Sequence, residues 1–489
     1  MATPSLTFRN VTVIDGSGSS GFLADVAVSE GRIASVGEAA TGAREVDGRG
    51  LVLCPGFVDV HSHDDTAFIR FPHMAFKLAQ GVTSEISGNC GSSAAPHDPS
   101  QPPRPGDLAA GADWLDLAGY FAACEAANPA INNAMLVGHN KVRYMVMGME
   151  ARTASADEVA LMRALVAGAM EQGAAGFSTG LIYEPGRYSD TAEVVALAAE
   201  SGSRGGLYAT HMRNEGDKLL EAVDEALHIA REARCGLHIS HHKSAGRRNW
   251  GRVGESLAKV DAANASGMDV TLDVYPYTAG SGPMNQYFNL NKIDIELAAN
   301  IRIAYCPDRP DFQGRMLTEI CEEHGWGLDE GVRQAVTGPR GKETVCIQFI
   351  IDEADIATNL RHPRMMVGSD GIPVLKGSPH PRLYGTMPRI LSEYVRERGV
   401  LTLEDAIHRM TQMSCERFGL AGRGLVREGY WADLVLFDPR IVRDTATYDD
   451  PQREPEGIRM VVVNGEVALE SGHHTGVGAG RMLRYRSGD

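Results

Sequence analysis

Two histidines, His61 and His63, end a short apolar stretch that begins at Pro55 and has the pattern of a β-strand. Side chains two positions apart on a strand point to the same side, so the two imidazoles are placed to bind one metal ion at the strand's carboxyl end. A lone His-x-His pair is a weak indication of such a site, because paired histidines also occur as surface or core residues. The pair alone therefore predicts only a candidate metal position.

Ionisable or metal-capable residues also follow the other strand-like segments in the middle of the chain. After His61 and His63 come Cys90, His139, His211, His241 with His242 and Lys243, Asp273 with Tyr275, and Asp370. In a barrel of parallel strands, the carboxyl ends of all strands meet on one face, and active sites lie there. Taken together, these His, Cys and Asp residues predict the site of a metal-dependent hydrolase.

The elements that would position these residues alternate between strand-like and helix-like segments from about 55 to 420. Residues 155–172 begin with a Ser-x-x-Glu capping box and continue with helical apolar spacing, and residues 218–234 place their apolar side chains on one helical face. Short strands are expected between the helices, at 135–138, 206–210, 237–240, 270–274 and 365–368. Repeated βα units of this length predict an α/β fold with a (β/α)8 TIM-type barrel.

Three segments depart from this rhythm. Residues from about 281 to 345 are rich in Asn, Asp, Pro and Gly, and they are interpreted as an insertion in the barrel that could lie over the site. Residues 1–54 and 421–489 contain short alternating apolar runs with hairpin signals at Glu30-Gly31 and Asn464-Gly465. We expect these two ends to form the N-terminal and C-terminal parts of one small β-sandwich, with the barrel domain at 55–420.

The composition is that of an ordinary globular protein with more than one domain: 489 residues, 43% hydrophobic and 22% charged. A formal net charge of −16 argues against nucleic acid or an anionic membrane as the main partner. No signal-peptide core or transmembrane stretch is visible, and the eight scattered cysteines are typical of reduced thiols. We expect a cytoplasmic protein with a small-molecule partner, while the sequence gives no indication of the oligomeric state.

A set of short motifs runs along nearly the whole chain. The most specific is Gly88-Asn89-Cys90-Gly91, and His61-Ser62-His63 and Ser369-Asp370-Gly371 accompany it. The others are Gly81-Val82-Thr83, Gly176-Phe-Ser-Thr-Gly-Leu-Ile-Tyr183, Thr210-His-Met-Arg-Asn-Glu215, Ile239-Ser-His-His-Lys243, Tyr275-Pro-Tyr277 and Pro381-Arg-Leu-Tyr-Gly385. In these motifs the sequence resembles the N-acyl-D-amino-acid deacylases (D-aminoacylases) of the amidohydrolase superfamily.

The resemblance implies a ligand set for zinc. One ion would be held tightly by Cys90, His211 and His241. His61 and His63 would form a neighbouring position that is weaker or empty, with Cys90 able to bridge the two. Most relatives in the superfamily use a carboxylated lysine as the bridge, whereas here the Cys90 thiolate would supply the negative charge.

The resemblance also implies a mechanism and a substrate. Zinc lowers the pKa of its bound water towards about 7. Asp370 would act as the general base and then as the acid that protonates the leaving amine. The substrate-binding groups that match the family pattern are Lys243, Tyr275 and Arg382 and, more loosely, Tyr183 and Ser281. The implied reaction converts an N-acyl-D-amino acid into a carboxylate and a free D-amino acid.

Structural roles stay open for several of these residues. A lone Cys90 would be interpreted as a buried structural thiol, and Asp370 as a turn or helix-cap residue. His139 follows a strand and either belongs to the site or packs beside it. Asp64 and Asp65 are expected to orient histidines rather than to bind metal.

Two other functions also stay open. The first is an amidohydrolase that acts on a cyclic amide (hydantoin or dihydropyrimidine) or on a dipeptide-like substrate; a lysine in place of Cys90 would have favoured the cyclic-amide branch. The second is a barrel that has lost catalysis and serves as a binding or scaffold protein. Such a protein should lack some metal ligands, whereas all the expected ones are present here.

Overall fold

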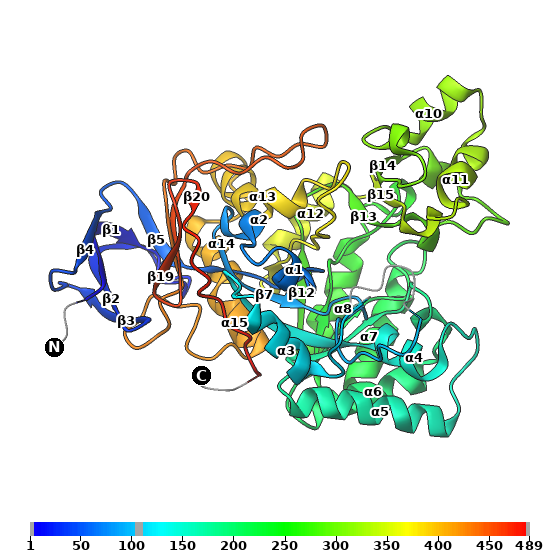
Figure 1. Ribbon diagram of the computed structural model, residues 1–489, viewed down its shortest axis with the longest axis horizontal. Helices are drawn as coiled ribbons and strands as arrows, with labels where there is room; N and C mark the ends of the chain where they lie inside the picture. The colour runs from blue at the N-terminus through cyan, green and yellow to red at the C-terminus, as the bar shows by residue number, and fades with distance from the viewer. Residues whose placement is uncertain (1–3, 103–110, 486–489) are drawn as a thin grey trace.

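A barrel of parallel strands forms the centre of the molecule (Figure 1). The structure is a computed structural model that describes residues 4–102 and 111–485. Within these residues, eight strands lie in one parallel sheet: β6 (Phe57–Asp59), β7 (Val82–Ser87), β8 (Asn132–Gly138), β9 (Gly176–Gly180), β10 (Leu207–His211), β11 (Gly236–Ile239), β12 (Val270–Val274) and β16 (Met365–Val367). A bridge between Ser62 and Gly371 joins the segments that follow the two edge strands. The predicted (β/α)8 barrel is therefore confirmed.

Helices connect the strands and cover the outside of the barrel. They are α1 (Ala67–Arg70), α2 (Ala75–Leu78), α3 (Leu117–Ala126), α4 (His139–Met147), α5 (Ala156–Glu171), α6 (Thr191–Gly202), α7 (Leu219–Ala233), α8 (Val253–Ala265), α12 (Glu353–Arg361), α13 (Arg382–Arg389), α14 (Leu403–Met410) and α15 (Gln412–Phe418). The shorter or irregular turns are η1 (Gly186–Tyr188), η2 (Arg247–Asn249), η3 (Met284–Gln286), η4 (Pro310–Phe312), η5 (Gly341–Glu343) and the π-helical η6 (Ile390–Glu397).

The capping box expected at the start of α5 is present. The backbone N–H of Ser155 donates to the Glu158 carboxylate at 2.8 Å, and the Glu158 N–H donates to the Ser155 hydroxyl at 3.3 Å. These bonds satisfy donors that a helix start leaves free. Among the helices of the described residues, none is both long and apolar enough to pass through a membrane.

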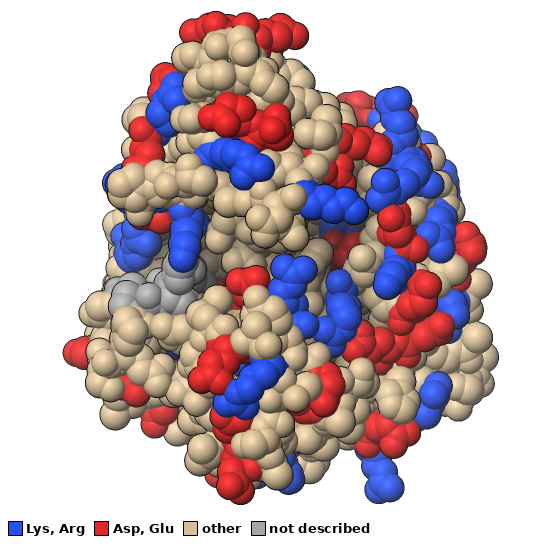
Figure 2. All heavy atoms as spheres, turned by 90° about the vertical axis from the view of Figure 1, so that its right-hand side faces the viewer, with Lys and Arg blue, Asp and Glu red and all other residues tan. Residues whose placement is uncertain are grey.

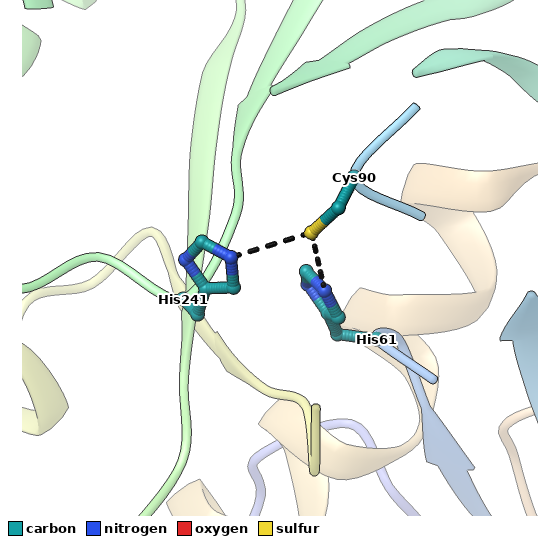
Figure 3. Close-up of side chains that lie close together, drawn as sticks. All are labelled: His61, Cys90 and His241. Carbon is teal, nitrogen blue, oxygen red and sulfur yellow. Dashed lines mark hydrogen bonds between the residues drawn. The ribbon is translucent and has the colours of Figure 1, made fainter. Parts of the chain in front are cut away.

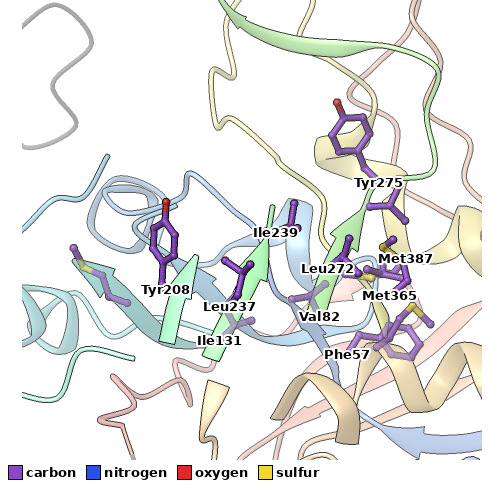
Figure 4. Packing of buried hydrophobic residues seen from close by; sticks show 14 of the residues in the cluster. Phe57, Val82, Ile131, Tyr208, Leu237, Ile239, Leu272, Tyr275, Met365 and Met387 are labelled. Carbon is purple, nitrogen blue, oxygen red and sulfur yellow. The ribbon is translucent and has the colours of Figure 1, made fainter. Parts of the chain in front are cut away.

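Alternation along the strands decides which side chains face the helices and which face the barrel interior. Leu237 and Ile239 of β11 and Leu272 of β12 belong to the apolar layer shared with the helices (Figure 4). The intervening residues, His238 and Asp273, are fully buried and contact each other at 2.9 Å. Polar groups thus occupy interior positions of the barrel beside apolar ones.

The two ends of the chain form one sheet beside the barrel, as predicted for the β-sandwich. Among the described residues, nine strands belong to it: β1 (Leu6–Val13), β2 (Phe22–Ser29), β3 (Arg32–Gly37), β4 (Arg44–Asp47), β5 (Val52–Pro55), β17 (Leu434–Phe437), β18 (Ile458–Val463), β19 (Glu466–Glu470) and β20 (His473–His474). β5 joins the halves, pairing parallel with β1 and antiparallel with β17. The outermost residues of the two predicted terminal segments, 1–3 and 486–489, lie outside the described residues.

A separate lobe follows β12 and lies at the upper right of Figure 1. Its described strands are β13 (Gly280–Pro283), β14 (Ile301–Tyr305) and β15 (Val345–Gln348), and its helices are α9 (Ile295–Ala298), α10 (Leu317–His324) and α11 (Leu328–Val336). The lobe has a small apolar core of its own, which includes Phe312 and Ile320. It covers the same part of the chain as the insertion expected at 281–345.

Candidate metal centre and active site

A cysteine and three histidines come together at the carboxyl ends of the barrel strands. Sγ of Cys90 lies 3.3 Å from Nε2 of His61, 3.4 Å from Nε2 of His241 and 3.8 Å from Nδ1 of His211. Figure 3 shows His61 and His241 with ring nitrogens directed at the sulfur. All four side chains are buried. The predicted ligands therefore converge from β10 and from the segments after β6, β7 and β11.

The donor set fits a zinc ion. Zinc–sulfur bonds of about 2.3 Å and zinc–nitrogen bonds of about 2.0–2.1 Å in a tetrahedron place sulfur and nitrogen roughly 3.6 Å apart, close to the separations at Cys90. Burial alone would raise the pKa of the Cys90 thiol, but the imidazoles of His61 and His241 beside it hold that pKa well below its usual range. A thiolate with imidazole neighbours is a ligand combination that zinc prefers.

Three residues of the site have a strained backbone. Cys90, His241 and Asp370 have φ values of 52°, 36° and 50°, a region that non-glycine residues rarely occupy. Each of the three lies two or three residues beyond the end of a barrel strand, where the chain bends away from the sheet. Such strain persists only where the surrounding structure enforces it, and it clusters at functional sites.

A second group of possible ligands overlaps the first. Nε2 of His63 lies 3.1 Å from Oδ1 of Asp370, and Nε2 of His61 lies 3.6 Å from the same oxygen. One possible ligand atom from each of these three residues lies within 4.8 Å of those of the other two. His61 belongs to both groups. The structure therefore brings together residues for two adjoining candidate metal positions.

Asp370 is held as a carboxylate. Its Oδ2 atom lies 3.0 Å from Nη2 of the buried Arg382. Burial would raise the pKa of Asp370, but Arg382 and His63 lower it well below the usual range. A carboxylate that is able to accept a proton is thus kept ionised beside the candidate ligands.

A cavity of about 930 Å³ opens above this site. The predicted site residues in its walls are Tyr183, His211, His241, Lys243, Tyr275, Ser281 and Asp370. Cys90, His61, His63 and Arg382 are not part of that lining. Figure 2 shows the hollow on this face, between the lobe that carries α10 and α11 above and the helical part below, with Lys and Arg side chains around it. The volume is in the usual range of small-molecule sites.

Polar atoms beside the cavity lack partners among the described residues. The hydroxyl of Tyr275 and the Nε and Nη1 atoms of Arg382 are buried and make no hydrogen bond there. The Arg382 guanidinium lies 4.6 Å from the Tyr275 ring centroid and donates to the backbone carbonyl of Ser281 at 3.3 Å. Buried polar groups without partners are costly, so these atoms are candidates for contacts with a polar ligand.

Lys243 and Tyr183, two further predicted substrate groups, also line the cavity. Nζ of Lys243 donates to the Glu215 carboxylate at 2.6 Å and lies 5.9 Å from the Tyr275 ring centroid. The hydroxyls of Tyr183 and Tyr287 are 3.1 Å apart. Tyr287 comes from the lobe after β12, so this contact joins the lobe to the barrel across the cavity.

The expectation for Asp64 and Asp65 is wrong. Asp64 contacts the buried Lys77 at 3.0 Å, and Asp65 accepts the backbone N–H of Ala94 at 3.1 Å. Besides Asp370, the carboxylates that approach candidate histidine ligands are Glu215 and Asp273. Asp273 reaches Nδ1 of His61 at 3.3 Å, from an inward position on β12 that strand alternation alone indicates.

His139 does not belong to the site. It begins α4, is fully buried, and its Nε2 atom lies 2.8 Å from the Glu193 carboxylate. Arg143 contacts the same carboxylate. Nε2 of His139 is thus engaged away from the candidate ligands, while its Nδ1 atom and Nε of Arg143 make no hydrogen bond within the described part of the chain.

Comparisons with known proteins agree with this architecture. The model of the Amidohydrolase family matches residues 44–329 and 339–469. The chain is 41% identical over 477 residues to a D-aminoacylase of Alcaligenes xylosoxydans xylosoxydans, covering 96% of each chain. It is 42% identical to an N-acyl-D-glutamate deacylase of the same organism, covering 93% of this chain and 91% of the relative.

A solved structure extends the likeness to three dimensions. The crystal structure of N-acyl-D-glutamate deacylase from Bordetella bronchiseptica, in complex with zinc and a phosphonate inhibitor that mimics the tetrahedral intermediate, superimposes with a TM-score of 0.90 at 38% identity. The match covers 99% of this chain and all of the other. The chain belongs to the Amidohydrolase family, in the group of the D-aminoacylases and N-acyl-D-amino-acid deacylases, and is an amidohydrolase that acts on linear amides.

Proposed function

We propose that this enzyme hydrolyses N-acyl-D-amino acids to a carboxylate and a free D-amino acid, with Asp370 as general base and acid. The observation that carries the proposal is the position of Asp370. It lines the cavity, lies within 3.1 Å and 3.6 Å of His63 and His61, and is kept ionised by Arg382. The preference for D substrates is inferred from the activities named for the relatives.

Cys90, His211 and His241 are proposed to hold one zinc ion, and His61 and His63 to form a second, weaker position with Cys90 between the two. The convergence of these side chains supports this assignment. A zinc ion bound there would supply a water of lowered pKa and would polarise the substrate carbonyl.

Asp370 moves the proton. Its carboxylate accepts a proton from the attacking water and then delivers it to the nitrogen of the leaving amine. The carboxylate faces the cavity on one side and Arg382 on the other. Because Arg382 favours the ionised form, the proton is released readily to the amine, which is a far stronger base.

Lys243 and Arg382 are proposed to bind the free carboxylate of the substrate, with Tyr275, Tyr183 and Ser281 around it. The unpartnered atoms of Arg382 and Tyr275 support this role, because a substrate carboxylate or oxyanion would satisfy them. Arginine provides a planar fork and lysine a point charge. We further propose that the enzyme works in the cytoplasm on small molecules rather than on nucleic acid or membranes.

The test is a panel of N-acetyl-D-, N-acetyl-L- and cyclic amides, assayed for release of free amino acid together with the metal content of the protein. Turnover of N-acetyl-D-amino acids with zinc bound is expected. Cys90→Ala should lose the zinc and the activity together, since the thiolate contacts three of the proposed ligands. Turnover of cyclic amides alone would contradict the proposed reaction, and a C90A protein with full zinc content and activity would contradict the ligand set.

A further inference from the structure

Glu215 lies beside the candidate metal centre, in the lining of the cavity. It lies four residues after His211 and is only 8% exposed. Its Oε2 atom lies 3.3 Å from Nε2 of His211, and its Oε1 atom lies 3.0 Å from Nδ1 of His241 and 2.6 Å from Nζ of Lys243. One carboxylate therefore contacts two histidines and the cation proposed to bind the substrate.

The two histidines present opposite nitrogens to Glu215 and to Cys90. The nitrogens that face the Cys90 sulfur are Nδ1 of His211 and Nε2 of His241, whereas Glu215 faces the other nitrogen of each ring. The negative charge of a carboxylate favours the N–H form of the ring nitrogen beside it, and the second nitrogen of a neutral imidazole then carries the lone pair. Nε2 of His211 makes no hydrogen bond within the described residues, so Glu215 acts there through its charge at 3.3 Å. By its position Glu215 thus favours in both rings the tautomer that can bind a metal next to Cys90.

Lys243 acts against this arrangement at His241. Its Nζ atom lies 2.8 Å from Nδ1 of His241. If Lys243 donated a proton to Nδ1, the neutral ring would carry its hydrogen on Nε2, which faces Cys90, and that hydrogen would exclude a metal. Glu215 accepts a hydrogen bond from Lys243 at 2.6 Å and so draws this donor away from Nδ1 of His241, which lies 3.0 Å from the same carboxylate oxygen. Two of the three N–H donors of Lys243 then bind Glu215 and the backbone carbonyl of His241. The third donor is available to a ligand in the cavity.

We propose that Glu215 is a positioning residue that sets the metal-binding tautomers of His211 and His241 and directs Lys243 towards the substrate carboxylate. This inference rests on the proposed function, since it concerns the same metal position and substrate clamp. Asp273 has a related geometry at His61, where it contacts one candidate ligand and the interior residue His238. Glu215 differs because it serves two ligands and a cavity cation at once.

The test measures zinc affinity by competition with a chelator, in addition to activity. Removing a carboxylate that orients a metal ligand typically weakens metal binding by about 10–100-fold. Glu215→Gln should show a loss of this size, together with a rise in KM of about tenfold from the misdirected Lys243. Glu215→Asp retains the charge and should recover part of the zinc affinity.

A double variant separates the tautomer effect from a general loss of structure. Lys243→Met removes the competing donor, so E215Q/K243M should bind zinc more tightly than E215Q alone, even though it has one more substitution. The matched control is Glu193→Gln. Glu193 is also buried against a histidine and an arginine but lies away from Cys90, and its removal should leave zinc affinity unchanged.

The opposing results are distinct. Unchanged zinc affinity in E215Q, or a double variant that binds more weakly than E215Q, would overturn the positioning role while C90A still tests the proposed function. Glu215 is also close enough to His211 and His241 to be a metal ligand itself. In that case E215Q would lose one equivalent of metal while cobalt substitution still gave the thiolate absorption of Cys90, and that result would overturn the proposal too.

Discussion

Two clusters of buried charged side chains lie near the same strand ends, and they differ in what they face. The first contains the candidate ligands with Asp370 and Arg382, and it borders the cavity. The second is centred on Lys77 of α2 and lies behind β6 and β7. Both place charges where desolvation is costly, so the difference between them indicates which charges serve chemistry and which serve the fold.

The Lys77 cluster is closed off from the cavity, whose lining includes none of its members. The ammonium contacts the carboxylates of Asp59, Asp64 and Glu85, the last two at 3.0 Å and 3.5 Å, and it donates to the Ser369 hydroxyl at 3.1 Å. All these side chains are fully buried. Burial and the neighbouring carboxylates raise the pKa of Glu85 well above its usual value, and burial also raises the pKa of Asp64. We interpret this cluster as structural, since none of its members lines the cavity.

The cluster beside the cavity is open. The Tyr275 hydroxyl and two nitrogens of Arg382 are unpartnered within the described part of the chain, and the backbone is strained at Cys90, His241 and Asp370. These features cost stability without an evident structural return. Carboxylate oxygens without hydrogen-bond partners also occur at Asp64 and Glu85 in the Lys77 cluster. The strained backbone and the position beside the cavity are therefore what mark the first cluster as the functional one.

The sharpest way to break this comparison is Asp370→Asn. The substitution keeps the shape of the side chain but removes the proton acceptor, and general acid–base catalysis contributes about 10²–10⁴-fold. We expect kcat to fall by this factor with zinc content unchanged, as measured by steady-state kinetics and metal analysis. The matched control is Asp355→Asn, because Asp355 is a buried carboxylate that accepts the Gly251 N–H away from the cavity. Equal losses in both variants would contradict the special role of Asp370.

The barrel and the convergence of the site could be predicted from the sequence because both depend on local patterns. Capped amphipathic helices such as α5 and short apolar strands such as β12 repeat along the chain, and the carboxyl ends of parallel strands must meet on one face. His211 ends such a strand, and Cys90, His241 and Asp370 lie within three residues of the end of one. Their convergence therefore required only the order of the elements.

The orienting groups could not be predicted in this way. Glu215 lies beyond the end of β10 on a loop, and its partner His241 is 26 residues further along the chain. Lys77 reaches Asp64 from a helix of only four residues, which has too little pattern to orient a side chain. Asp64 was assigned to the histidines because it follows His63 in the sequence. Closeness along the chain does not decide the direction of a side chain, and Asp64 contacts Lys77 instead.

Lys77→Met tests the closed cluster. Removing one partner of a buried ion pair typically costs about 3–5 kcal/mol, because the other charges stay buried without compensation. We expect a loss of this size in the free energy of unfolding, measured on proteins with equal zinc content. Lys77 contacts Ser369, the residue before Asp370, so some loss of activity should follow from the loss of fold.

The control for this experiment is Lys259→Met. Lys259 also pairs with an aspartate, Asp224 at 2.8 Å, but on the surface. Exposed pairs contribute about 0–1 kcal/mol, so K259M should be nearly as stable as the unmodified protein. A K77M protein as stable as K259M would show that the closed cluster does not hold the fold, and the contrast between the two clusters would lose its basis.

The smallest effect is expected at His139, which the strand pattern placed near the site and the structure does not. His139→Gln should weaken the contact with Glu193 and cost roughly 1–3 kcal/mol of stability, with activity within about twofold.

Burial opposes ionisation of Glu193, but His139 and Arg143 hold its pKa below the usual value. A carboxyl that is more acidic in the folded state stabilises the fold above its unfolded pKa and loses that contribution as the pH falls through its folded pKa. The difference in unfolding free energy between H139Q and the unmodified protein should therefore be largest near neutral pH and shrink in acid. A fall in kcat without a change in stability would contradict this expectation and would indicate that His139 acts in the active site.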